Sequence, residues 1–161
     1  MIGVLGIDPG LASTGYGVIR VAQGRFQHVT HGVIKTPSGE SPGTRLRHIH
    51  EQILVLLTTY RPNMAGIESL YFTKNVSSAI PVAQARGVVL LALAQHGTPA
   101  QEYTPQVIKQ AVVGSGQADK EQVSQMVRII LGMSEVPRPD HAADALAAAI
   151  TRYNLREAPG V

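Results

Sequence analysis

The chain is 161 residues long, with 44% hydrophobic and 16% charged residues, a formal net charge of +3 and no cysteine. One domain with a sizeable core is expected at this length, the missing cysteines exclude disulfides and thiolate metal sites, and the mildly basic balance permits a polyanionic partner. No apolar run approaches the roughly 18 residues of a membrane span, and the first residues lack the basic start of a signal peptide, so we expect a cytoplasmic protein without membrane contact.

Three strands are predicted in the first third of the chain. They are rich in β-branched residues, glycine-containing turns separate them, and they cover residues 2–8, 14–21 and 26–35. Such short turns predict antiparallel pairing. A loop (TPSGESPGT) then leads into a helix over 45–60, where apolar residues recur at helical spacing.

Helices and short buried strands alternate in the rest of the chain. Strands are predicted at 64–70 and 99–103, and helices at 75–96 (bent or restarted near Pro81), 105–113, 119–131 and 140–155. Three strands followed by two crossover units predict an α/β fold with a five-stranded mixed sheet and helices on both faces. We expect a single domain over 1–155 and a short tail over 156–161.

Two acidic residues are predicted near strand ends, where functional sites of α/β sheets collect. Asp8 closes the first strand in GIDPG, and Glu68 lies near the end of the fourth strand in AGIESL. A glutamate in an apolar strand costs free energy unless it is paired or bound to metal. The alternatives are an aspartate that caps its own turn and an exposed glutamate at a strand edge.

The last helix adds a second polar group, in PRPDHAADALAAA. Asp140 follows a proline, so we expect it to be the N-cap. His141 and Asp144 are three residues apart and share one helix face. The surrounding alanines let the helix lie close to the sheet, which would bring Asp144 near the strand-end acids. A salt bridge between Asp144 and an arginine is the alternative.

Three carboxylates and an imidazole suit Mg²⁺ or Mn²⁺ better than zinc. Their mutual repulsion would make an empty site costly, and a divalent cation relieves it. This donor set suggests phosphodiester cleavage with two metal ions, one activating water and the other stabilising the leaving oxygen. None of the serines and threonines near the acids is paired with a base, so no protein nucleophile is expected.

Five segments, in this order, resemble the RuvC family of bacterial Holliday-junction resolvases: GIDPGLASTGYGVI, GIESLYFTKNVSSA, QARGVV, QVIKQAVVGSGQADKEQV and HAADALAAAI. The resemblance implies a ribonuclease-H-like fold and a homodimer that nicks two strands of a four-way DNA junction symmetrically during recombination and repair. It also implies two Mg²⁺ ions per site, replaceable by Mn²⁺, and the branch-migration partners RuvA and RuvB.

The resemblance further implies which residues act. Asp8, Glu68 and Asp144 match the family's catalytic, metal-binding acids, and His141 stands where the best-known relatives have an aspartate, with Asp140 as a reserve candidate. The resemblance also implies that Tyr71 stacks on a base of the opened junction and that Lys109 and Lys120 contact DNA. Lys74 and Asn75 lie near a predicted helix start, where they are suited to bind phosphate. We expect the helix at 75–96 to form the dimer contact, because it is long and apolar.

Three other functions are compatible with part of these motifs. GIDPG also resembles the phosphate loop of actin-like sugar kinases and ATPases, but these need a second, duplicated domain that 161 residues cannot hold. Another ribonuclease-H-like nuclease could share the acids and prefer a different nucleic acid. A non-catalytic junction-binding module would be favoured by a broken acid set, and only the histidine at 141 points that way.

Overall fold

The computed structural model of the chain describes residues 1–69 and 76–157. Its strands are β1 (Ile2–Asp8), β2 (Ser13–Ala22), β3 (Arg25–Lys35), β4 (Met64–Glu68) and β5 (Ala100–Tyr103). Its helices are α1 (Pro42–Tyr60), α2 (Val76–His96), α3 (Pro105–Val113), α4 (Lys120–Ile130) and α5 (Asp140–Asn154). The candidate DNA residues Tyr71, Lys74 and Asn75 lie outside the described residues.

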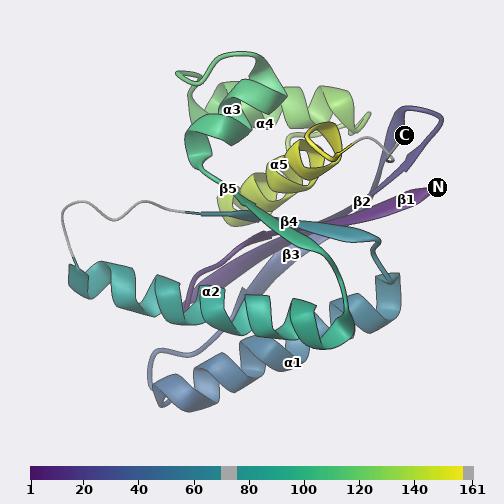
Figure 1. Cartoon of the computed structure of the whole chain (residues 1–161). Coiled ribbons are helices and arrows are strands. Elements are labelled where there is room, and N and C mark those ends of the chain that lie inside the picture. Colours follow the sequence, from purple (N-terminus) through teal and green to yellow (C-terminus); the bar gives the residue numbers. More distant parts are fainter. Residues whose placement is uncertain (70–75, 158–161) are drawn as a thin grey trace.

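The strands form one mixed sheet in the order β3-β2-β1-β4-β5 (Figure 1). The first three strands are joined by short turns and pair antiparallel, whereas β4 pairs parallel with both β1 and β5. Parallel pairing needs a long crossover connection, and α1 and α2 provide the two crossovers. The predicted five-stranded mixed sheet is thus confirmed.

Helices cover both faces of the sheet (Figure 1). On one face, α1 and α2 pack against a buried cluster that includes Leu5 and Ile7 of β1. On the other face, α5 lies against the sheet with α3 and α4 outside it, and this cluster includes Val4 of the same strand. The alternation along β1 follows from the two-residue period of a strand, which points neighbouring side chains to opposite faces. Gly6 and Asp8 therefore share the α5 face with Val4.

Some element boundaries differ from the sequence-based expectations. Helix α1 begins at Pro42, because Ser41 accepts a hydrogen bond from the Thr44 amide and acts as N-cap before the apolar repeat begins. Strand β4 ends at Glu68. Helix α2 is one element that continues through Pro81, so of the two expected alternatives, a bend or a restart, the restart does not occur. A proline early in a helix removes only one intrahelical hydrogen bond.

The expected N-cap at Asp140 is also wrong. The carbonyl of Pro139 accepts hydrogen bonds from the amides of Ala142 (3.0 Å) and Ala143 (3.1 Å), so Pro139 holds the N-cap position without any side-chain cap. Asp140 instead lies in the first turn of α5, where the positive end of the helix dipole stabilises a negative charge.

Candidate active site

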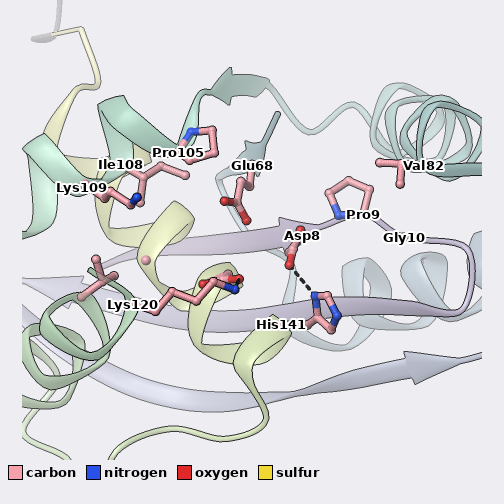
Figure 2. A pocket seen from close by; sticks show the side chains of 13 residues that line it. Asp8, Pro9, Gly10, Glu68, Val82, Pro105, Ile108, Lys109, Lys120 and His141 are labelled. Carbon is pink, nitrogen blue, oxygen red and sulfur yellow. Dashed lines mark hydrogen bonds and ion pairs between the residues drawn. The ribbon is translucent and has the colours of Figure 1, made fainter. Parts of the chain in front are cut away.

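A cavity of about 310 Å³ opens at the carboxyl ends of β1 and β4 (Figure 2). Asp8 ends β1 and Glu68 ends β4, and the two strands are parallel neighbours with Ile7 opposite Ile67. Each acid is one residue past this pair, so both carboxylates reach the cavity from the α5 face of the sheet. Topology thus brings together two residues that are 60 positions apart.

Helix α5 closes this side of the cavity because small residues on both elements allow a close approach. A Cβ added at Gly66 would lie 2.5 Å from the carbonyl oxygen of Ala148, and one at Gly6 would overlap the carbonyl of Ala145. The alanines of α5 predicted the close contact from the helix side. The matching glycines of the sheet are a contribution that the sequence analysis missed.

The close contact brings His141 and Asp144 to the strand-end acids. His141 Nδ1 lies 2.8 Å from Asp8 Oδ2, and the dashed line of Figure 2 marks this pair. One ligand atom from each of Asp8, His141 and Asp144 lies within 4.8 Å of the others. Glu68 lines the same cavity from the opposite strand. All four predicted residues therefore meet in one cleft.

Asp8 does not serve as the cap of its own turn. That role falls to Thr14, whose buried hydroxyl donates to the Gly10 carbonyl (2.6 Å) and accepts from the Gly10 amide (3.2 Å). The turn after β1 is thereby fixed without the Asp8 carboxylate. Asp8 itself is buried and aimed at His141.

The cleft concentrates negative charge in a partly desolvated place. Burial, the charge of Asp8 and the charge of Asp144 raise the pKa of Glu68 to about 8. Burial and the charge of Asp8 also raise the pKa of Asp144, and the ammonium of Lys120 opposes this rise. Lys120 Nζ lies 3.7 Å from Asp144 Oδ2, so the salt-bridge partner of Asp144 is a lysine and not the arginine considered above.

A divalent cation fits this donor set. Carboxylate oxygens are the ligands that Mg²⁺ and Mn²⁺ prefer, and one imidazole is compatible with Mn²⁺. Burial and, after it, repulsion among the carboxylates raise the pKa values of Glu68 and Asp144, and such a cation would relieve the repulsion. The residues present therefore match a metal-binding cleft by charge and by ligand chemistry.

The remaining candidates divide between the cleft and its surroundings. Lys109 and Lys120 both line the cavity. Asp140 is exposed and is not among the described residues that line it. One wall of the cavity is apolar and comes from α2 and α3: Val82, Pro105 and Ile108. The sequence did not indicate this wall, because scattered apolar residues resemble those of an ordinary core.

Arg86 lies in the segment QARGVV and carries an ion pair outside the cleft. Its guanidinium forms two hydrogen bonds with the Glu102 carboxylate, one of them 2.6 Å between the terminal nitrogen and Oε2. This pair connects α2 to β5, the strand beside Glu68. Hydrogen bonding to Glu102 raises the pKa of Arg86.

Comparison with known proteins gives a consistent result. The family model described as crossover junction endodeoxyribonuclease RuvC matches residues 4–152. A protein of that name from Treponema denticola is 56% identical over 152 residues, which cover 94% of this chain and 85% of the relative. Another from Heliobacterium modesticaldum is 48% identical and covers 91% of each chain.

Solved structures agree with the sequence relatives. A structure titled "T. thermophilus RuvC in complex with Holliday junction substrate" superposes with a TM-score of 0.91, 40% identity, and coverage of 95% of this chain and 93% of that chain. The yeast mitochondrial Holliday junction resolvase Ydc2 superposes with a TM-score of 0.67 at 15% identity, a likeness that concerns the fold alone.

Proposed function

The chain belongs to the RuvC family of crossover junction endodeoxyribonucleases, and from this membership and the geometry of its cleft we propose how it acts. It resolves four-way DNA junctions by nicking two strands symmetrically in recombination and repair. The observation that carries the assignment to particular residues is the meeting of Asp8, Glu68, His141 and Asp144 in one cavity beside two lysines.

Asp8, Glu68, His141 and Asp144 are the proposed metal ligands, for two Mg²⁺ ions that Mn²⁺ can replace. At these ligands the ions would supply activation of the attacking water and neutralisation of charge on the leaving oxygen. The carboxylates hold their places because β1, β4 and α5 are packed elements, so little reorganisation accompanies metal binding. His141 also keeps Asp8 oriented through the hydrogen bond between Nδ1 and Oδ2.

The two lysines are proposed to act on the DNA backbone. Lys120 pairs with Asp144, and its side chain is 73% exposed. A cation among the carboxylates would weaken that attraction and leave the ammonium available to donate a hydrogen bond to the phosphate at the cut. Lys109 lines the same cavity and would contact a neighbouring phosphate.

Tyr71, Lys74 and Asn75 are proposed to bind the opened junction, with Tyr71 stacking on an unpaired base. These residues lie three to seven positions after Glu68 in the sequence. The Thermus thermophilus relative was solved with a Holliday junction, which supports the same substrate here.

A second copy of the chain is proposed to pack on the outer side of α2. Ile80 and Leu91 are both 52% exposed there, and the exposed Ala83 and Gly87 lie between them at helical spacing. By length and composition alone α2 could cross a membrane, with 22% of its apolar window buried, but a covered dimer face explains this apolar surface equally. Replacing Leu91 by glutamate should give monomers in sedimentation velocity, whereas the same change at exposed Val55 of α1 should not.

The cellular setting follows from the same proposal. A junction-cutting enzyme works where chromosomal DNA lies, so we propose a cytoplasmic location and functional coupling to RuvA and RuvB. Family membership argues against an actin-like kinase. The meeting of Asp8, Glu68 and Asp144 in one cleft argues against a non-catalytic binding module.

The test is cleavage of a mobile synthetic four-way junction with Mg²⁺, Mn²⁺ or EDTA, beside linear duplex and single-stranded controls. Wild-type protein should make paired, symmetric nicks only with metal and only in the junction. Asp8→Asn should bind the junction and fail to cut it. Cutting by Asp8→Asn would remove this residue from the site, and binding without metal-dependent cutting by the wild type would favour the binding module.

A further inference from the structure

A pair of histidines lies on β3, the edge strand farthest from β5 in the sheet order. The register between β2 and β3 shifts at this point, since Val18 pairs with Thr30 and Ile19 pairs with His28. One residue of β3, Val29, is thus left over as a bulge. Residues three apart in a regular strand point to opposite faces, but one extra residue restores the same face.

The bulge brings the two imidazole rings into contact. His28 Nε2 lies 2.7 Å from His31 Nδ1, and the ring centroids are 4.9 Å apart. At this distance the rings share one proton, because one nitrogen must donate and the other accept. Burial and the charge of His31 lower the pKa of His28, which favours the uncharged ring.

A cavity of about 430 Å³ lies beside the pair. Both rings line it, together with residues 133–138 of the loop that connects α4 to α5. Its charged side chains are Glu135 and Arg138, both exposed. The loop continues through Pro139 into α5, which carries His141 in its first turn.

We propose that His28 and His31 form a second metal site, separate from the cleft, for a borderline divalent transition ion such as Zn²⁺. Imidazole nitrogen is a preferred ligand of Zn²⁺, Cu²⁺ and Ni²⁺ and a poor one for Mg²⁺. Replacing the shared proton by zinc requires the nitrogens to be about 3.3 Å apart for tetrahedral bonds of about 2.0–2.1 Å. Rotation of the two partly exposed rings supplies the small extra separation.

The third ligand comes from the loop side of the cavity. Among the described residues, the cleft holds the one group of three candidate ligands within 4.8 Å of one another, so the histidine pair needs a partner that moves. The exposed Glu135 carboxylate lines the cavity and can rotate toward the rings. Binding would then tie the loop before α5 to the edge strand and stabilise the start of that helix.

The experiment is calorimetric titration of the full chain with Zn²⁺ in excess Mg²⁺, with wild type and variants compared so that any Zn²⁺ bound in the cleft contributes equally to each. Wild-type protein should bind one equivalent of Zn²⁺ that a His28→Gln/His31→Gln variant loses or binds at least 100-fold more weakly. A His48→Gln/His50→Gln variant removes two histidines of α1 and should behave as wild type. Equal stoichiometry and affinity in the wild type and the β3 variant would overturn the proposal.

A second readout needs no variant. Co²⁺ added to wild-type protein in excess Mg²⁺ should shift the ring-proton resonances of His28 and His31, while those of His48 hold their positions. Unshifted β3 histidines would refute the site even if the β3 variant failed to fold. The outcome is independent of the proposed nuclease function, because junction cutting is not part of either measurement.

Discussion

Removing the charge of Glu68 should stabilise the metal-free protein while abolishing cutting. The cleft holds this carboxylate partly buried beside Asp8 and Asp144, and its pKa rises from the ordinary 4.5 to about 8. The folded protein therefore binds this proton more tightly than the unfolded chain does. As a result, the contribution of Glu68 to the free energy of unfolding falls as the pH rises from about 4.5 to about 8, and this contribution is level outside that window.

The structure sets an upper limit on the effect. Each tenfold change in proton affinity is worth about 1.4 kcal/mol, so the rise to about 8 corresponds to about 5 kcal/mol. Glu68→Gln carries no charge at any pH and escapes this cost. The variant should exceed the wild type in unfolding free energy by up to that amount at pH 8, and the difference should shrink to near zero at pH 5.

Urea unfolding followed by circular dichroism, in EDTA at pH 5 and pH 8, measures this difference. Saturating Mg²⁺ at pH 8 should narrow it, because the cation stabilises the wild type more than the variant. Glu51→Gln is a suitable control, since Glu51 lies in an exposed pair with Arg47 on α1. A difference at pH 8 no larger than at pH 5 would refute the electrostatic account of the cleft.

Three further results are expected. Gly6→Ala should destabilise the protein by about 1–3 kcal/mol or more and lower its Tm, because the new methyl group overpacks against α5. Gly43→Ala should keep the wild-type Tm, since the space around its Cβ position is open. An unchanged Tm for Gly6→Ala would argue against the close contact between α5 and the sheet. His141→Asp should keep cutting junctions with a lower ratio of Mn²⁺ to Mg²⁺ rate, because a carboxylate is the harder ligand, and loss of cutting with both metals would contradict this. Lys120→Met should move the pH profile of cutting to higher pH, because the charge of Lys120 lowers the pKa of Glu68. A profile that stays in place or moves to lower pH would contradict this effect of Lys120 on Glu68.

Much of the site was predictable because its signals are local. Asp8 and Glu68 interrupt apolar strands near their ends, where the functional sites of α/β sheets collect. His141 and Asp144 share a helix face because they are three residues apart. The family motifs then identify which strand ends and which helix belong together.

Other features depended on contacts that no local pattern records. The N-cap of α5 is Pro139 instead of Asp140, because the backbone enters the helix one residue earlier than the side-chain preference indicates. Arg86 finds Glu102 on a strand 16 positions away. His28 and His31 meet only because a bulge changes the alternation of β3.

The sequence by itself determined the order of strands and helices, the mixed sheet, and the residue types that gather at the cleft, since periodicity and strand-end position are properties of short segments. The tertiary structure alone decided how closely α5 approaches the sheet, because that distance is set jointly by Gly6 and Gly66 on the strands and the alanines of the helix. It also decided the raised pKa of Glu68, which depends on burial and on charges brought from other elements. Both quantities arise from contacts between distant segments, and these exist only once the chain has folded.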